Sequence, residues 1–121
     1  MELPEEFTLT EMLRFHGKFR KSRFSIPDLL AMLELEREKD KEIKDFSSGM
    51  KQRLKIGLAL FFDSEIVLLD EPATNLDTKA TTWYRNMVQE HAPDRTLIIS
   101  SNQECEYDFC QEVLNIEDYK R

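Results

Sequence analysis

The sequence predicts an α/β fold, in which a helical section is followed by part of a parallel β-sheet. Three early segments carry apolar residues at helical intervals, whereas two later segments are short, continuous apolar runs separated by another helical pattern. Alternation of strands and helices is typical of α/β domains with parallel strands. We therefore expect a helical subdomain over residues 1–48 and the C-terminal part of an α/β core over residues 49–121.

Three helices are expected before the sheet. The capping-box pattern Thr-Leu-Thr-Glu begins a helix over about residues 9–20, and Ser-Ile-Pro-Asp begins a second over about 27–38. The charged run 34–45 has no clear apolar periodicity, so we expect it to be the solvated end of the second helix and a connector. Apolar residues at helical spacing predict a third helix from about Ser48 to Phe62.

The second section has the pattern of a βαβ unit. Ile66–Leu69 and Thr96–Ile99 are continuous apolar runs, as in strands that are buried on both faces of a parallel sheet. Asp77 lies between them at a helix-start position, before apolar residues that share one helical face. A short helix over about 103–110 and a last strand, Val113–Ile116, would complete this section.

Composition and charge exclude several classes of function. The net charge of −7 leaves no basic excess for phosphate contacts along a nucleic acid, so direct DNA or RNA binding is disfavoured. Cys105 and Cys110 are the only cysteines and lack the spacing of a zinc or redox site, which indicates free thiols in a reducing compartment. With no long apolar run and no secretory pattern at its start, the chain is expected to be soluble and cytoplasmic.

The first candidate for chemistry is the segment Phe-Ser-Ser-Gly-Met-Lys-Gln-Arg, which begins at Phe46. Ser47, Ser48 and Gly49 lie at the predicted start of the third helix. Free backbone N–H groups and the helix dipole favour a phosphate there, hydroxyls add hydrogen bonds, and glycine allows close approach. The alternative is that Ser47 is only the N-cap of this helix, a role for which serine is strongly preferred.

The second candidate is the pair Asp70 and Glu71, which directly follows the apolar run Ile66–Leu69. Ligands of open α/β sheets bind outside the carboxyl ends of the strands, where these acids would lie. One acid there can hold a Mg²⁺-bound water, and the second can polarise a water that attacks phosphorus. The alternative is an ordinary polar turn at the end of a strand.

Taken together and in this order, the two segments resemble the ATP-binding-cassette (ABC) ATPases. The signature motif of that family is Leu-Ser-Gly-Gly-Gln, and its Walker B motif is four apolar residues followed by Asp-Glu. Phe46–Met50 retains the signature serine and last glycine, with Ser48 in place of the first glycine, and Ile66–Glu71 matches Walker B in full. Ala73–Asp77 resembles the D-loop, and Leu9–Leu13 resembles the start of the family's helical subdomain.

This resemblance implies a P-loop NTPase-like parallel sheet, from Walker B onward, preceded by an ABC-type helical subdomain. It also assigns roles to individual residues. Glu71 would be the general base, Asp70 would hold the Mg²⁺ shell through water, and Asp77 would join the two sites of a dimer. The residues that would contact, in trans, the γ-phosphate of ATP bound to a partner subunit are Ser47, Ser48, Gly49 and Met50.

One catalytic position departs from the family pattern. Asn102 stands where the family has its switch histidine, and asparagine can donate a hydrogen bond but cannot become cationic. The only histidines, His16 and His91, lie in no motif, so we expect helix-surface or helix-end roles for them.

The resemblance further implies an ATPase subunit of a transporter. Such a subunit forms a homodimer, or pairs with another ATPase subunit, around ATP and Mg²⁺. It would contact a transmembrane permease subunit through its helical subdomain, at the cytoplasmic face of the membrane.

A phosphate-binding loop is the main element that this sequence does not contain. That loop requires GxxxxGK followed by Ser or Thr, and the only glycines here are Gly17, Gly49 and Gly57. We expect the Walker A and Q-loop motifs upstream of residue 1, so that this chain is a fragment that cannot bind ATP alone.

Two alternatives stay open at this point. The chromosome-maintenance and DNA-repair ATPases share both motifs but insert long coiled coils, whereas residues 9–38 show no sustained heptads. A non-catalytic binding module that docks on a complete ATPase would fit the missing loop.

Overall fold

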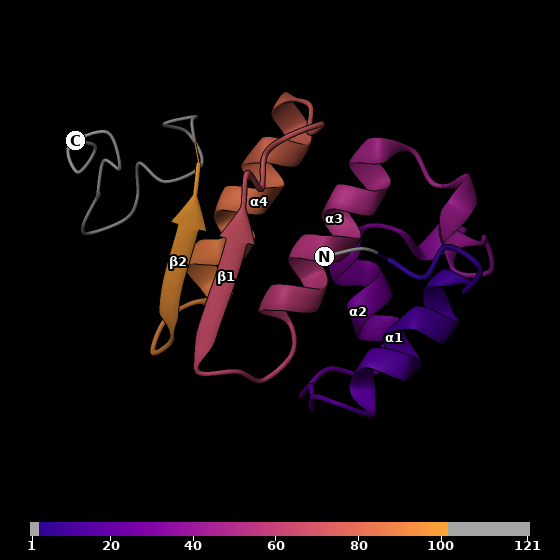
Figure 1. Ribbon diagram of the computed structural model, residues 1–121, viewed down its shortest axis with the longest axis horizontal. Helices are drawn as coiled ribbons and strands as arrows, with labels where there is room; N and C mark the ends of the chain where they lie inside the picture. Colours follow the sequence, from indigo (N-terminus) through magenta and orange to yellow (C-terminus); the bar gives the residue numbers. More distant parts are fainter. Residues whose placement is uncertain (1–2, 102–121) are drawn as a thin grey trace, which may run out of the picture.

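The computed structural model describes residues 3–101 and confirms a mixed α/β fold with a small parallel sheet. Its elements, in chain order, are α1 (Leu9–Gly17), α2 (Ile26–Leu33), η1 (Glu36–Glu38), η2 (Ile43–Asp45), α3 (Ser48–Leu60), β1 (Ile66–Asp70), α4 (Thr78–His91) and β2 (Thr96–Ser100). Figure 1 shows α1, α2 and α3 gathered on one side of the molecule and β1, β2 and α4 on the other. The helix expected at about 103–110 and the strand expected at Val113–Ile116 lie outside the described residues.

Helix α1 begins with the expected capping box. The Thr8 hydroxyl oxygen accepts a hydrogen bond from the Glu11 backbone N–H (3.2 Å), and Glu11 Oε1 accepts one from the Thr8 N–H (3.0 Å). This reciprocal pair satisfies two N–H groups at the helix start. The helix ends at Gly17 rather than near residue 20, and Phe19, which the sequence pattern places on its apolar face, is exposed.

The segment after α2 corrects the expectation of a longer, solvated helix that reaches residue 38. Helix α2 ends at Leu33, and Glu34 follows in the left-handed conformation, with φ of 58°. Leu35 and Ile43 expose only 5% and 0% of their surface. These two apolar side chains therefore hold the charged run against the core, where it forms the short turns η1 and η2.

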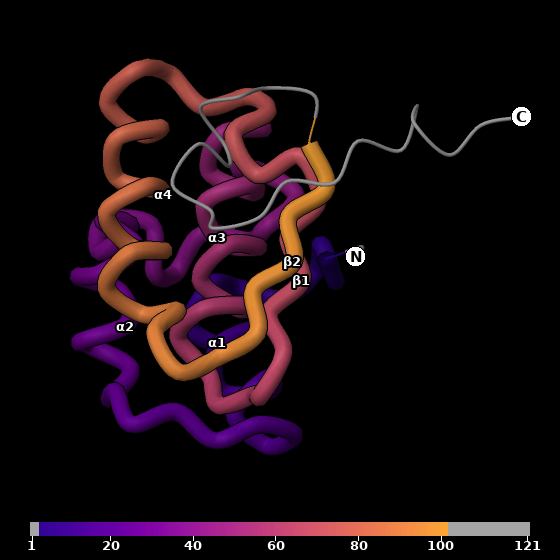
Figure 2. The backbone as a smooth tube through the Cα atoms, turned by 90° about the vertical axis from the view of Figure 1, so that its left-hand side faces the viewer, coloured from indigo at the N-terminus to yellow at the C-terminus, as the bar shows by residue number. Residues whose placement is uncertain are grey.

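Strands β1 and β2 pair in parallel, as expected, with Asp70 opposite Ser100 at their carboxyl ends. Helix α4 makes the crossover between them and is capped by Asp77, whose Oδ1 accepts a hydrogen bond from the Ala80 N–H (2.7 Å). In Figure 2 the helices lie to one side of the two strands. The carboxyl ends of both strands therefore meet at one edge of the sheet.

One face of this sheet is exposed within residues 3–101. Val67 and Leu69 are buried, whereas Ile66, Leu68 and Ile98 expose 54%, 67% and 51% of their surface. The apolar runs have the pattern of strands that are buried on both faces, but in the described part of the chain helices cover only one face.

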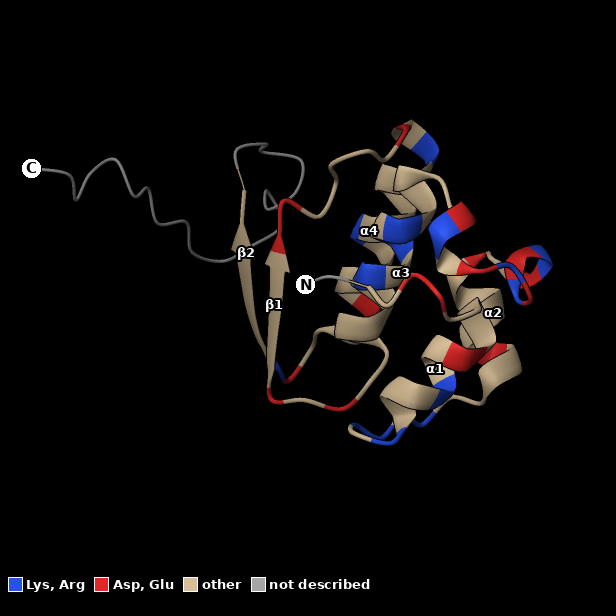
Figure 3. Cartoon of the chain, turned by 45° about the vertical axis from the view of Figure 1, so that its right-hand side comes forward, with Lys and Arg blue, Asp and Glu red and all other residues tan. Residues whose placement is uncertain are grey.

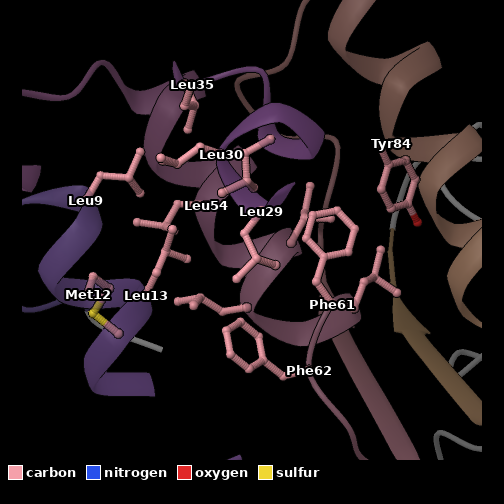
Figure 4. Packing of buried hydrophobic residues seen from close by; sticks show 14 of the residues in the cluster. Leu9, Met12, Leu13, Leu29, Leu30, Leu35, Leu54, Phe61, Phe62 and Tyr84 are labelled. Atoms are coloured by element: carbon pink, nitrogen blue, oxygen red, sulfur yellow. The ribbon is translucent and has the colours of Figure 1, made fainter. Parts of the chain in front are cut away.

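Within residues 3–101, an apolar core joins the helical section to the sheet. It includes buried side chains of α1, α2, α3, α4 and β1, and Figure 4 shows among them Leu9, Met12, Leu13, Leu29, Leu30, Leu54 and Tyr84. Gly57 allows α3 to approach α2 closely, because a Cβ at this position would overlap the side chain of Leu33. No helix within residues 3–101 is both long and apolar enough to cross a membrane.

Arg95 ties the end of α3 to the end of α4. Its guanidinium donates hydrogen bonds to the backbone carbonyls of Leu60 (2.7 Å), Phe62 (2.8 Å), Ser64 (2.9 Å) and His91 (3.2 Å). Burial lowers the pKa of Arg95, yet an arginine remains charged at neutral pH. The cation is also favoured by the negative ends of the two helix dipoles.

Candidate functional site

The start of α3 is a capped helix terminus with unused donors. Ser47 is its N-cap, and the Ser47 Oγ accepts a hydrogen bond from the Met50 N–H (3.1 Å). Accepting this bond leaves the hydroxyl hydrogen of Ser47 able to donate to a ligand. Within residues 3–101, the backbone N–H groups of Ser48 and Gly49 donate to no protein acceptor. The capping role of Ser47 is therefore confirmed, and it is compatible with an anion site at the same terminus.

Both candidate acids lie at the carboxyl end of β1, which is red in Figure 3. Asp70 is the last residue of the strand, Glu71 follows it, and both side chains are exposed. The Glu71 N–H donates to the Ser100 carbonyl (2.7 Å), so the ladder continues one residue past the strand. Glu71 has a φ of 43°, a left-handed conformation that costs about 1–3 kcal/mol in a residue other than glycine.

The helix terminus and the acidic turn are in direct contact. Gln52 Nε2 donates to the carbonyls of Pro72 (3.0 Å) and Glu71 (3.3 Å). A Cβ at Gly49 would lie 3.0 Å from the carbonyl oxygen of Asn75, so glycine is the residue that fits this contact without displacement. The structure thus brings together the two segments that carry the sequence motifs.

Sequence reasoning missed Gln52. It lies one helical turn after Ser48, on the part of α3 that contacts the strand end. The available indication of its role was a polar residue four positions after the start of a helix, in a sequence that also contains an acidic turn. That spacing alone does not specify which backbone carbonyls the amide reaches.

Asp77 ends the turn that follows Glu71 and caps α4 through its carboxylate. The side chain is exposed, as are those of its neighbours Thr78 and Lys79. One carboxylate oxygen accepts the Ala80 N–H, and the remaining acceptor sites face solvent in this chain. Capping accounts for its structural role, and the contact between subunits stays a prediction.

The acidic pair fits a magnesium shell only in part. Mg²⁺ prefers oxygen ligands and usually keeps several waters while it binds one or two carboxylates and the phosphates of a substrate. Asp70 and Glu71 supply such oxygens, but within residues 3–101 no group of three or more His, Cys, Asp or Glu side chains could enclose a metal ion. The donor set therefore suits Mg²⁺ that arrives with a nucleotide.

The two histidines pack against aromatic rings. His16 lies on α1 with its ring 4.6 Å from that of Phe62, and burial, reinforced by the charge of Arg20, lowers its pKa. His91 is the last residue of α4 and packs edge-on against Phe61 at 5.0 Å, and burial likewise lowers its pKa. His91 is thus a helix-end residue as expected, whereas the Nε2 atom of His16 is buried and has no hydrogen-bond partner in the described part of the chain.

Comparison with known proteins identifies the family. The model of the ABC transporter family matches residues 2–74, which include the start of α3 and the end of β1. This chain belongs to the ABC transporter family. Members of that family use ATP and Mg²⁺. Asn102 lies outside the described residues.

Individual ABC proteins resemble the chain over most of its length. The Nod factor export ATP-binding protein I of Mesorhizobium japonicum is 34% identical over 110 residues, which are 83% of this chain and 31% of that protein. ATP-binding cassette sub-family A member 17 of Rattus norvegicus is 29% identical over 103 residues, which are 81% of this chain and 6% of that protein. The chain thus spans a third or less of the length of these two relatives.

A solved structure supports the same fold. The putative ABC transporter ATP-binding protein of Pyrococcus furiosus superposes with a TM-score of 0.78 at 19% identity, over 99% of this chain and 60% of that one. At this identity the likeness shows the fold alone. The mixed α/β architecture with its parallel pair of strands is therefore that of known ABC ATPases.

Proposed function

We propose that this chain is the part of an ABC transporter ATPase that carries the signature and Walker B motifs, and that it acts within a dimer. The observation that supports the proposal most directly is the contact between the capped start of α3 and the acidic turn, made by Gln52 on Glu71 and Pro72. An isolated capping serine or an isolated polar turn would need no such connection. The sequence motifs on both sides of this contact lie within the family match.

In this proposal the acids act on the nucleotide of their own subunit. Glu71 is the general base that orients and deprotonates the attacking water, and Asp70 holds the Mg²⁺ shell through water. The bound metal supplies charge stabilisation for the transferring phosphoryl group. The exposure of both carboxylates at the strand end leaves room for the nucleotide.

The start of α3 acts on the nucleotide of the partner subunit. The Ser47 hydroxyl and the N–H groups of Ser48 and Gly49 donate to the γ-phosphate oxygens, while Met50 lies in the first turn beside them. Ser48 is exposed and, in place of the usual glycine, adds a hydroxyl at the helix terminus where the phosphate would approach. Asp77 is proposed to contact the partner at the same interface.

Other parts of the assembly lie beyond the residues that carry this site. No GxxxxGK segment occurs in residues 1–121, so we propose that the phosphate cradle belongs to residues not included in this sequence. The helical subdomain, residues 1–48, is proposed to contact a transmembrane permease subunit at the inner face of the membrane. Asn102 is proposed to donate a hydrogen bond to the γ-phosphate.

Titration of labelled ATP with Mg²⁺ tests this function. It is applied to residues 1–121 alone and to a longer chain that includes a phosphate-binding loop and carries Glu71→Gln. We expect no binding by the short chain and a stable, ATP-containing dimer of the longer variant, because the amide keeps the site's shape but cannot act as a base. Glu65→Gln, an exposed glutamate just before β1, is the matched control and should turn over ATP normally. Unaided hydrolysis by the short chain, or normal hydrolysis by the Glu71 variant, contradicts the proposal.

A non-catalytic binding module is the second candidate, and the lack of a phosphate-binding loop in residues 1–121 favours it. In that case the chain would bind a complete ABC ATPase as a regulator. Glu71→Gln in this chain would then leave the hydrolysis rate of the complex unchanged, which distinguishes the two functions.

A further inference from the structure

Gln52 makes contacts that capping and core packing do not require. It lies on the second turn of α3, and its side-chain amide reaches across to the chain just past β1. Both hydrogen bonds go to backbone carbonyls, those of Glu71 and Pro72, so the contact fixes the path of the main chain. The residue is half-buried, and it lies beside a cavity of about 360 Å³ whose wall also includes Asp70 and Pro72.

The main chain at Glu71 needs such support. Its φ of 43° is a left-handed conformation that residues with a Cβ adopt rarely, so surrounding contacts must hold it. On one side the Glu71 N–H donates to Ser100; on the other, the Glu71 carbonyl accepts from the Thr74 N–H (3.1 Å) and from Gln52 Nε2 (3.3 Å). The side chain of Gln52 thus links this turn to helix α3.

We propose that Gln52 is a positioning residue for Glu71. It also couples the two nucleotide sites of the dimer: the site to which this subunit supplies the Glu71 carboxylate, and the site at which the same subunit contacts the partner's phosphate through the start of α3. Ser47 caps the helix on which Gln52 lies, so a displacement of the α3 terminus toward a partner's phosphate is carried to the Glu71 turn. Gly49 adds a second contact between α3 and this turn, because it lies close to the Asn75 carbonyl and leaves little space for the turn to move relative to the helix. This inference rests on the proposed function, in which Glu71 is the base.

The chemistry of the amide explains why glutamine suits this position. Two backbone carbonyls require a donor, and the Nε2 group offers two hydrogens at the length needed to span from α3. A glutamate would set a carboxylate against two carbonyl oxygens, and a methionine would have the length without a donor. A lysine retains both reach and donors.

Hydrolysis by the complete ATPase subunit that contains this segment tests the inference. For Gln52→Met we expect kcat to fall by about 10- to 100-fold, because small displacements of a catalytic group have effects of this size. The KM for ATP should change by less than about threefold, since binding of the nucleotide does not use the base. Gln52→Lys should recover most of kcat. Gln89→Met, on the exposed face of α4, is the matched control and should behave as the unaltered protein.

A purely structural role predicts a different pattern. It would lower kcat and the melting temperature together in every Gln52 variant, with no recovery by lysine, and that result would overturn the inference. If Gln52→Met does not fold, Gln52→Asn replaces it, because asparagine keeps the amide but is too short to reach both carbonyls. The same fall in kcat with little change in KM is then expected.

The variant Glu71→Gln separates this inference from the proposed function. If Glu71→Gln abolishes hydrolysis but Gln52→Met does not lower the hydrolysis rate, the inference about Gln52 fails while the proposed function stands. If Glu71→Gln leaves hydrolysis intact, the proposed function fails. In the Glu71→Gln background, Gln52→Met should lower the residual rate by less than about twofold, because a positioning residue acts through the base that is already lost.

Discussion

At the scale of single residues, Gly49 is a position where an added methyl group would alter the candidate site. Its Cα hydrogen faces the Asn75 carbonyl, and an added methyl group would lie 3.0 Å from that oxygen. A contact this tight forces the backbone of the turn after Glu71 to move. Gly17, at the end of α1, offers the opposite case, because a Cβ there would meet nothing within 4 Å.

Gly49→Ala should therefore lower the free energy of unfolding by about 1–2 kcal/mol through overpacking. Gly17→Ala is the matched control, and it should raise the same quantity by up to about 1 kcal/mol, since alanine restricts the unfolded chain. Urea unfolding of residues 1–121 measures both. Equal effects of the two substitutions would refute the close contact between α3 and the Asn75 turn.

The two histidines make stability depend on pH. Burial lowers the pKa of His16 and of His91 below their ordinary value of 6.5, so the unfolded chain binds protons that the folded chain does not. Stability should be complete above pH 6.5 and fall as the pH is lowered through the folded-state pKa values. Glu11, whose pKa is lowered from 4.5 by hydrogen bonds at Thr8, adds a loss only at lower pH.

Melting temperatures between pH 8 and pH 5 test this expectation. His91→Phe, which retains an aromatic ring against Phe61, should flatten the pH dependence in this window. A slope unchanged by His91→Phe and by His16→Phe together would contradict the assignment to these two groups.

At the scale of helices and strands, Arg95 connects the ends of α3 and α4 through one planar guanidinium. Arg95→Met should lower the free energy of unfolding by about 2–4 kcal/mol, because several charged hydrogen bonds to partly buried carbonyls are lost. Arg95→Lys should recover less than half of the lost free energy of unfolding, since an ammonium group cannot reproduce the planar arrangement of guanidinium N–H donors. Arg37→Met, at an exposed position of η1, is the control for loss of an arginine. A loss below about 1 kcal/mol for Arg95→Met would show that these contacts do not support the fold.

The elements that the sequence predicted best are those that depend on local chemistry. The capping box at Thr8, the cap at Asp77 and the parallel pairing of β1 with β2 need only neighbours in sequence or a short crossover. The end of α2 and the turns that follow were missed because burial of Leu35 and Ile43 is a tertiary effect. The same reasoning explains why Gln52 was missed, since its partners lie 19 and 20 residues away.

At the scale of the whole molecule, the candidate site lies where two layers meet. The start of α3 and the carboxyl end of β1 are joined on one edge, while Ile66, Leu68 and Ile98 present an apolar face elsewhere on the sheet. Under the proposed function this face packs against the remaining strands of a complete ATP-binding subunit. The burial expected from the apolar runs would then be completed by residues outside this sequence.

In the proposed function, the α3 terminus acts on the partner's nucleotide while Glu71 acts on the nucleotide of its own subunit. Ser47→Asp tests the first part cleanly, because aspartate still caps a helix but places a negative charge against the γ-phosphate. Dimers of Ser47→Asp alone and of Glu71→Gln alone should both be inactive. In a mixed dimer, however, one site combines an intact Glu71 with an intact α3 terminus.

The measurement that decides the matter is therefore ATP hydrolysis by an equal mixture of complete subunits carrying Ser47→Asp and Glu71→Gln, allowed to exchange. We expect recovery to about a quarter of the unaltered rate, because half of the randomly paired dimers are mixed and each has one intact site of two. No recovery in a mixture whose subunits demonstrably exchange would mean that α3 and Glu71 of one subunit serve the same nucleotide, which contradicts the proposed function.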